Sequence, residues 1–404
     1  MENKIVEKYE ENGRVIYKGI GNFDGDSLMN LRDLVNRSKI KYGDRTAFKF
    51  KRDRKLVEKS YKDFASDVDC IGTALCSSDL KNKKIAIISE NRYEWAVAYM
   101  AIANGTGVVV PLDKHLPQVE IENLLERGKC EAIFFSKQYV SIMEDIAKNN
   151  SRVKMFICMD EIPMDKKKRF VTMDYLAGEG TKKLIKGNKT FVEAEINNEA
   201  MSFLLFTSGT TKASKGVMLS HKNIISNINA CAAIIKLKED DVHLSLLPLH
   251  HTFENTIGFS YMLYSGVCIA YCEGIKHIAQ NLQEFNVSIL VAVPAIYETL
   301  FNRLQDGIKK SGKSGFVKKL ESISEILYKW KINLRRLIMS PVRNKLAPKL
   351  RFMVSGAAPI DNNIIKGFER MGIRFLQGYG LTETSPLVCV TNPFYELIGV
   401  WDML

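Results

Sequence analysis

The sequence predicts an α/β protein in which parallel sheets are layered with helices. Short apolar runs of strand length recur along the 404 residues, and helical patterns separate most of them, as in parallel-sheet proteins. Apolar residues make up 46% and charged residues 26% of the chain, a globular composition that excludes disordered and low-complexity classes. We predict strands at residues 84–88, 108–112, 132–136, 153–159, 201–206, 267–271, 289–293 and 350–354.

The first helix is predicted directly after the first of these strands. A turn at residues 89–91 starts it, and Gly105 ends it. Its apolar side chains recur at helical spacing, so one face should pack on the sheet; these are Trp95, Ala98, Tyr99 and Ile102.

Two polar stretches are predicted to be exposed connections, the basic run at residues 166–169 and the Gly- and Lys-rich run at residues 178–189. We therefore expect a subdomain boundary near residue 190. The first α/β subdomain would comprise residues 1–190, and a second subdomain would comprise residues 191–404.

The uncharged stretch at residues 255–272 is interrupted by Gly258 and Gly266. We predict a buried helix, a turn and a strand here, and not a membrane span. The eight cysteines show no spacing typical of a zinc site, which favours buried thiols in a reducing compartment. The charged N-terminus lacks an apolar signal-peptide core. These features predict a soluble, cytoplasmic protein.

Positive charge is concentrated in one segment. The formal net charge is +12, and residues 303–351 contain fourteen basic and three acidic residues. Apolar residues recur there at spacings of three and four, which predicts one amphipathic helix with a basic outer face. This helix packs on the core of its own chain, or it forms a surface for anionic lipid or another polyanion. No nucleic-acid-binding signature is present, so nucleic acid is not a predicted partner. The stripe comprises Phe316, Leu320, Ile323, Leu327, Trp330, Leu334 and Leu337.

A loop rich in hydroxyl groups follows the strand predicted at residues 201–206. It carries five hydroxyl residues, two glycines and two lysines in ten positions. Hydroxyl and backbone N–H groups can donate to phosphate oxygens, and lysine adds a positive charge. The spacing does not match a Walker A loop, and composition alone leaves a ligand-free turn as the alternative. The loop reads Thr207-Ser208-Gly209-Thr210-Thr211-Lys212-Ala213-Ser214-Lys215-Gly216.

This loop resembles the phosphate loop of the adenylate-forming enzymes, a superfamily that includes acyl-CoA synthetases, peptide-synthetase adenylation domains and firefly-type luciferases. Lys215 matches the lysine that defines the pattern. Two positions depart from it, because Lys212 stands where Gly is common and Ser214 where Pro is common.

Two further segments resemble the nucleotide motifs of the same superfamily, in the same order. The first follows the strand at residues 350–354, with Asp361 as the predicted cap of the next helix. The second follows a strand-like run at residues 373–376. The segments are Ser355-Gly356-Ala357-Ala358-Pro359 and Gln377-Gly378-Tyr379-Gly380-Leu381-Thr382-Glu383-Thr384.

Two more segments resemble the long-chain acyl-CoA synthetase branch. Residues 247–254 are similar to the segment that lines the pocket for the carboxylate substrate, and residues 293–298 also resemble this branch. His251 stands where long-chain members carry a histidine beside the reacting carboxylate, whereas His250 is unassigned. The resemblance covers roughly residues 20–395. It implies the large N-terminal lobe of the adenylate-forming fold, with a smaller β subdomain.

The resemblance implies activation of a fatty acid by ATP and Mg²⁺ to acyl-adenylate, followed by transfer to coenzyme A. Acyl chain length, CoA against a carrier-protein acceptor, and oligomeric state stay open. Catalytic roles fall to Lys215, His251, Thr382 and Glu383, and Mg²⁺ would be bound by Thr207 and Glu383. The nucleotide would be bound by Thr207, Ser208, Gly209, Thr210, Thr211, Lys215, Ser355, Gly356, Ala357, Ala358, Pro359, Gln377, Gly378, Tyr379, Gly380 and Thr382.

The small C-terminal lobe of the superfamily is expected to be missing, because the likeness fades after residues 392–396. One hypothesis is a truncated or frameshifted gene product of weak or no activity. The alternatives are one half of a split enzyme and a non-catalytic protein that binds nucleotide or acyl ligands.

Overall fold

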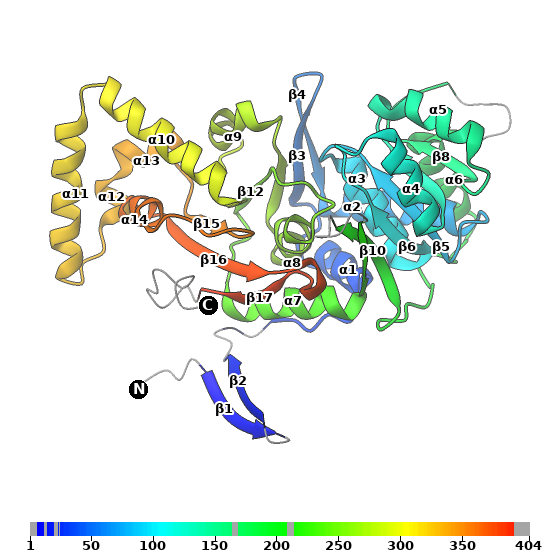
Figure 1. The fold of residues 1–404 in the computed structure, drawn as a ribbon, viewed down its shortest axis with the longest axis horizontal. Helices are drawn as coiled ribbons and strands as arrows, with labels where there is room; N and C mark the ends of the chain where they lie inside the picture. Colours follow the sequence, from blue (N-terminus) through cyan, green and yellow to red (C-terminus); the bar gives the residue numbers. More distant parts are fainter. Residues whose placement is uncertain are drawn as a thin grey trace.

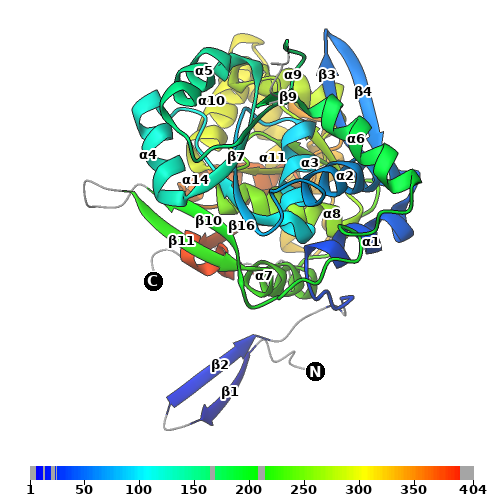
Figure 2. The same cartoon turned by 90° about the vertical axis from the view of Figure 1, so that its right-hand side faces the viewer.

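The computed structural model describes residues 6–11, 14–19, 23, 25–163, 169–207 and 214–391. Two large sheets lie next to each other, and helices are layered on both (Figures 1 and 2). This arrangement confirms the predicted α/β class. A two-stranded sheet of β1 (Val6–Glu11) and β2 (Arg14–Gly19) projects away from the rest (Figure 1).

The first sheet has seven strands, which are parallel except that β11 runs antiparallel to β10. Its helices are α2 (Tyr61–Cys76), α3 (Tyr93–Ala101), α4 (Gln118–Gly128), α5 (Val140–Asn149) and α6 (Met173–Ile185). The strand order is β11 (Lys215–Ser220), β10 (Met201–Thr207), β6 (Gly107–Pro111), β5 (Lys83–Ile88), β7 (Cys130–Phe135), β8 (Met155–Cys158) and β9 (Phe170–Thr172).

The second sheet has eight strands, parallel in its middle and antiparallel at both edges. The strand order is β17 (Leu387–Val390), β16 (Arg374–Gly380), β15 (Phe352–Ser355), β14 (Ile289–Ala292), β12 (Val242–Ser245), β13 (Cys268–Tyr271), β3 (Thr46–Arg52) and β4 (Lys55–Ser60). Its helices include α1 (Leu31–Tyr42), α7 (His221–Ile234), η3 (Phe253–Ser260), α8 (Tyr261–Ser265), α9 (Ile278–Glu284), α10 (Pro294–Lys310), α11 (Ser314–Lys329), α12 (Arg335–Ile338), α13 (Ser340–Leu346) and α14 (Asn362–Arg370).

All eight predicted strands are present, with ends shifted by a few residues. The central strands are covered on both faces, which explains why their sequences are continuous apolar runs; β14, for example, is buried throughout. The stretch at residues 255–272 contains most of η3, all of α8 and β13, as predicted. No helix in the described part of the chain is long and apolar enough to cross a membrane.

The prediction of an exposed connection at residues 178–189 is wrong, because helix α6 extends to Ile185. Gly180 makes the close packing of α6 on α2 possible, since a Cβ atom at this position would lie 1.8 Å from the carbonyl oxygen of Cys70. In the other predicted connection, residues 166–168 lie outside the described residues.

The subdomain boundary near residue 190 remains a prediction. Each of the two large sheets contains strands from both sides of this boundary. Strands β3 and β4 precede residue 190 but belong to the second sheet, whereas β10 and β11 follow it but belong to the first sheet. Two chain segments therefore join the halves of the molecule.

The predicted basic helix is divided into two helices, α11 and α12, and most of its apolar stripe does not pack on the core. Val317 and Ser324 are the buried residues of α11, and Leu320 is partly buried. The buried face is thus displaced from the predicted stripe, which leaves Phe316, Ile323, Trp330, Leu334 and Leu337 exposed.

Eight free cysteines agree only in part with the prediction of buried thiols. Five are buried, but Cys389 is exposed, and Cys70 and Cys272 are half-buried. Burial raises the pKa of the Cys130 and Cys231 thiols to about 12, so both thiols are protonated at neutral pH.

His221, the first residue of α7, is fully buried and joins three segments of the chain. Its Nδ1 accepts a hydrogen bond from Leu31 N–H (3.3 Å), and its Nε2–H donates to Ala103 O (3.1 Å), an arrangement that requires the neutral ring. Burial lowers the pKa of His221 to about 4. The unfolded chain, with an ordinary histidine pKa near 6.5, takes up the proton first as the pH falls.

Acidification is therefore expected to destabilise the fold through His221. The free energy of unfolding should fall by roughly 2 kcal/mol between pH 7 and pH 5 on account of this residue, and the loss ends below about pH 4. Urea unfolding at both pH values measures the change. A His221→Gln variant should lose about 2 kcal/mol less over this interval; an equal loss in both proteins would exclude His221 as the cause.

Candidate functional site

The two segments that resemble nucleotide motifs meet at the carboxyl ends of β15 and β16. Ser355, the last residue of β15, is paired with Gln377 of β16. Because neighbouring parallel strands end at the same edge of a sheet, residues 356–359 lie beside residues 378–380 (Figure 1). The structure differs from the prediction in one respect, since Gln377–Gly380 form the end of β16 and do not follow the strand. Asp361 caps α14 as predicted, and it accepts a hydrogen bond from Asn363 N–H (2.8 Å).

The backbone at these strand ends is tightly constrained. A Cβ atom on Gly380 would lie 1.9 Å from the carbonyl oxygen of Pro386, so only glycine fits there. Ala357 has a φ of 71°, in the left-handed region that few alanines occupy. Strain of this kind concentrates at functional sites.

A cavity of about 390 Å³ lies between these strand ends and the segment that follows β12. Of the predicted site residues, it brings together His251, Gly356, Ala357, Gly378, Tyr379, Gly380 and Thr382. Ser355, Ala358, Pro359, Gln377 and Glu383 lie in the same segments but do not line it. The remaining lining residues are Leu247, Pro248, Thr252, Phe253, Val293, Leu381, Pro386 and Leu387.

Two buried polar atoms at the site have no hydrogen-bond partner among the described residues, Ser355 Oγ and Gln377 Oε1. Each such atom costs about 1–3 kcal/mol of stability. Both belong to the segments that resemble nucleotide motifs. Neither residue lines the cavity, whereas Tyr379 does, and its exposed aromatic ring fits the flat base of a nucleotide.

The predicted phosphate loop joins β10 to β11. Thr207 is the last residue of β10 and Lys215 is the first residue of β11, and the two are paired directly across the hairpin. Ser208, Gly209, Thr210 and Thr211 lie outside the described residues. Helix α4 contacts its base, because Arg127 donates to Ser214 O (2.6 Å). Lys215 is exposed and takes part in no ion pair among the described residues.

The short helix η5 (Thr382–Thr384) lies against β11, so Thr382 and Glu383 come close to this hairpin. Asn227 of α7 holds the turn in place, since it donates to Thr384 O (3.0 Å) and accepts from Leu387 N–H (2.7 Å). Sequence reasoning missed Asn227, because one asparagine in an amphipathic helix gives no signal.

The adjacent histidines differ in their surroundings. His250 Nε2 lies 3.8 Å from Asp113 Oδ2, and the two histidine rings are 4.6 Å apart. Burial, followed by the neighbouring His251, lowers the pKa of His250 to about 4. Burial also lowers the pKa of His251, although its side chain remains exposed at the cavity. A neutral His251 can donate one hydrogen bond to a carboxylate.

An apolar space adjoins the cavity and leads into the interior. Both are lined by Phe253, Gly378 and Leu387, so the Phe253 ring stands where they meet. The space measures about 20 Å³, close to the volume of one water molecule. Phe253 was not singled out by the sequence. The other residues that line the apolar space are Cys231, Ile235, Leu237, Ile257, Tyr261, Met262, Ile289, Phe352, Val354 and Val390.

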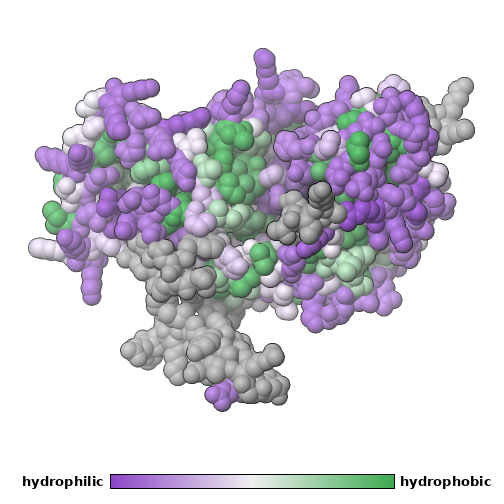
Figure 3. Space-filling view, viewed as in Figure 1, coloured by the Kyte–Doolittle hydropathy of each residue, from purple (hydrophilic) through white to green (hydrophobic). Residues whose placement is uncertain are grey.

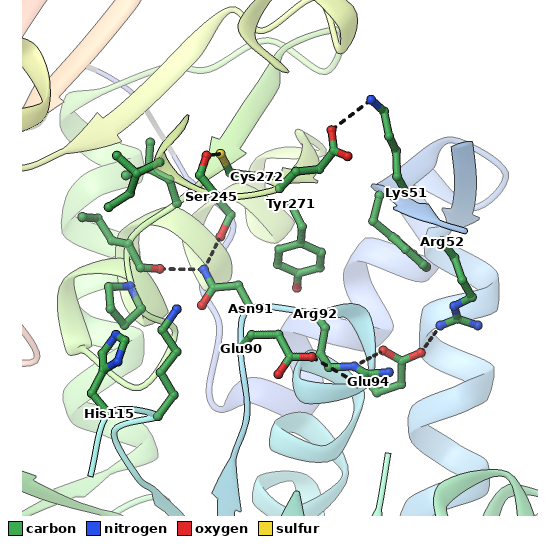
Figure 4. A pocket seen from close by; sticks show the side chains of 18 of the residues that line it. Lys51, Arg52, Glu90, Asn91, Arg92, Glu94, His115, Ser245, Tyr271 and Cys272 are labelled. Carbon is green, nitrogen blue, oxygen red and sulfur yellow. Dashed lines mark hydrogen bonds and ion pairs between the residues drawn. The ribbon is translucent and has the colours of Figure 1, made fainter. Parts of the chain in front are cut away.

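A second cavity, of about 820 Å³, opens between the two halves of the molecule (Figure 4). Three of the four Lys and Arg side chains that line it are already paired: Arg92 contacts Glu90, Glu94 and Asp160, Arg52 contacts Glu94, and Lys51 contacts Glu273 and Glu284. Lys114 forms no ion pair with the described residues. These pairs neutralise most of the positive charge that would attract an anion to this cavity.

Asn91, which lines the second cavity, links the two halves of the molecule by hydrogen bonds. Its side chain donates to Leu247 O (2.7 Å) and accepts from Leu249 N–H (3.1 Å), which fixes the segment before His251 (Figure 4). The sequence marked residue 91 only as part of a turn, since its partners lie more than 150 positions away.

Comparison with known proteins gives one matching family. Residues 35–401 match the family described as AMP-binding enzyme. The match begins later and ends later than the limits of roughly 20 and 395 predicted from the sequence.

Two curated relatives illustrate the similarity. Fatty acyl-CoA synthetase B of Dictyostelium discoideum is 28% identical over 417 residues, which cover 94% of this chain and 60% of the relative. Human long-chain-fatty-acid–CoA ligase 1 is 27% identical over 357 residues, covering 83% of this chain and 50% of the relative. This chain thus spans between half and three fifths of the length of these relatives.

A solved structure supports the fold. A long-chain-fatty-acid-CoA ligase from Archaeoglobus fulgidus superposes with a TM-score of 0.70 at 16% identity. The match covers 93% of this chain and 69% of the solved one.

Proposed function

Because the chain belongs to the AMP-binding enzyme family, we propose that it takes part in activating a long-chain fatty acid with ATP, first to acyl-adenylate and then to acyl-CoA. One observation carries the proposal: two separated motif segments and His251 line a single cavity, and that cavity adjoins an apolar space. A nucleotide and an aliphatic chain can therefore lie next to each other.

The residues of the cavity suit the parts of ATP. Tyr379 would stack on the adenine, and Thr382 would donate to the α-phosphate. The hydroxyl groups of the β10–β11 loop and the charge of Lys215 would hold the β- and γ-phosphates. In the first half-reaction a carboxylate oxygen bonds to the α-phosphorus, and the bond to the leaving pyrophosphate breaks. Two anions meet in this step, so positioning and charge neutralisation are the main requirements.

Glu383 and Thr207 are our proposed ligands for Mg²⁺. A carboxylate and a hydroxyl group are oxygen ligands of the kind this cation prefers. When bound, Mg²⁺ would reduce the negative charge of the phosphate oxygens.

The fatty carboxylate would lie beside His251, with its chain directed into the apolar space behind Phe253. This space is too small for an acyl chain as it stands, so binding requires the Phe253 ring to move. The polar boundary on one side and the apolar lining on the other favour an aliphatic substrate.

A Phe253→Trp substitution is expected to impede entry of the chain. The larger ring should weaken binding of a non-hydrolysable palmitoyl-adenylate analogue about tenfold or more, with little effect on ATP. Titration calorimetry with palmitoyl and acetyl analogues measures this selectivity. Equal weakening of both analogues would contradict a role for Phe253 in admitting the chain.

ATP–pyrophosphate exchange with palmitate tests the proposed chemistry. Exchange that depends on palmitate supports fatty acid activation. ATP binding without exchange would favour the alternative, a non-catalytic protein that binds nucleotide or acyl ligands. Coenzyme A as acceptor, Mg²⁺ dependence and a cytoplasmic location are proposed with the same function, and acyl chain length stays open.

A further inference from the structure

Helices α11 and α12 lie at one end of the molecule (Figure 1). Together with the segment between them, they carry a set of exposed apolar side chains. Phe316 is 53% exposed, Trp330 is 76% exposed and Leu337 is 70% exposed. Hydrophobic and hydrophilic residues are interspersed at this end of the molecule (Figure 3). We call this set of side chains the α11 surface; it comprises Phe316, Ile323, Ile326, Trp330, Ile332, Leu334 and Leu337.

Helix α11 is fixed to the protein by a different face. Val317, Leu320 and Ser324 point toward the core, and α11 contacts α10, α12 and α14. At about 100° per residue, the exposed Phe316, Ile323 and Ile326 fall within an arc of about 80° on another side of the helix. The protein therefore presents this apolar arc on a supported helix.

The side chains around the α11 surface include positively charged lysines that acidic side chains of the described residues do not neutralise. Lys318, Lys319 and Lys329 are exposed, and none of them forms an ion pair within the part of the chain that the structure describes. Two arginines nearby have structural partners instead. Arg335 pairs with Glu325 (2.9 Å), and Arg336 donates to Leu350 O (2.8 Å).

We propose that the α11 surface docks on an anionic phospholipid bilayer. Exposed apolar side chains next to lysines, with a tryptophan at the helix end, are typical of a helix that lies in a membrane interface. The charge excess of residues 303–351 complements anionic headgroups. None of these residues lines the three cavities described above.

Docking would place the protein at the bilayer, where fatty acids dissolve. The inference goes beyond the proposed function and does not depend on it, because lipid binding can be measured without turnover.

Vesicle sedimentation tests the docking. The chain should pellet with vesicles of phosphatidylglycerol and phosphatidylcholine, and at least tenfold less with phosphatidylcholine alone; 0.5 M salt should reduce binding.

The triple variant Phe316→Ser, Ile323→Ser, Trp330→Ser should lose binding at least tenfold, as should the double variant Lys318→Glu, Lys319→Glu. Leu56→Ser with Lys55→Glu is a matched control on the exposed β4 and should bind as the unmodified protein. Circular dichroism verifies that each variant folds.

The fluorescence of Trp330 reports where the contact occurs. In a Trp401→Phe background, the remaining tryptophans are Trp330 and the buried Trp95. Anionic vesicles should shift the emission to shorter wavelength. Unchanged emission despite pelleting, equal binding to neutral vesicles, or self-association through this surface without vesicle binding would each overturn the proposal.

Discussion

Replacing Lys215 with alanine is expected to weaken binding of ATP roughly 10- to 100-fold, the usual value of a hydrogen bond to a charged group. Lys215 is exposed at the end of the β10–β11 hairpin, forms no ion pair with the described residues and lies on the strand that contacts η5. Its charge is therefore available to the phosphates. Titration calorimetry with MgATP measures the loss.

Lys222→Ala provides the matched control. Lys222 is also exposed and follows β11 closely, but it pairs with Glu199. ATP affinity should be unchanged in this variant. If both lysine variants bind ATP as the unmodified protein does, the assignment of the phosphate loop is wrong.

Replacing Glu254 with alanine is expected to destabilise the protein by about 3–5 kcal/mol. Glu254 of η3 is completely buried, accepts a hydrogen bond from Ser245 Oγ (2.6 Å) and contacts His243 Nε2 (3.4 Å). Alanine removes the acceptor of the Ser245 hydroxyl and the partner of His243 Nε2, and it opens a cavity. Gly258 is adapted to this carboxyl group, since a Cβ atom there would lie 2.6 Å from it.

Urea unfolding measures the change, with Glu254→Gln as the control of similar shape. Glutamine retains an oxygen acceptor for Ser245, so it should cost about 1 kcal/mol or less. Because Glu254 anchors η3 one residue after Phe253, the alanine variant should also bind the palmitoyl-adenylate analogue more weakly. A loss of stability under 1 kcal/mol for alanine would contradict the role of Glu254 as an anchor.

The strands that the sequence predicted best are those covered on both faces. Residues 85–88 and 289–293 are continuous apolar runs because helices lie on either side of each sheet (Figure 1). The β3–β4 hairpin was missed, since lysines and arginines alternate with its apolar residues. Its place in the second sheet depends on pairing with β13, more than 200 positions later, which no local pattern encodes.

The candidate site was predictable to the extent that local motifs define it. Glycines and a tyrosine at residues 378–380 identify a close approach of backbone segments beside an aromatic ring. Asn91, Asn227 and Phe253 were not predictable, because each acts through a partner distant in sequence. The apolar face of α11 was assigned one residue out of register, since Phe316 and Val317 are both apolar and only packing decides which one is buried.

The most direct test of the shared nucleotide and acyl site is a crystal structure with a non-hydrolysable palmitoyl-adenylate analogue. We expect the adenine against Tyr379, the phosphate isostere near Thr382 and the aliphatic chain beyond a displaced Phe253 ring. An analogue bound away from the ends of β15 and β16, or a chain that leaves Phe253 in place and extends elsewhere, would contradict the account.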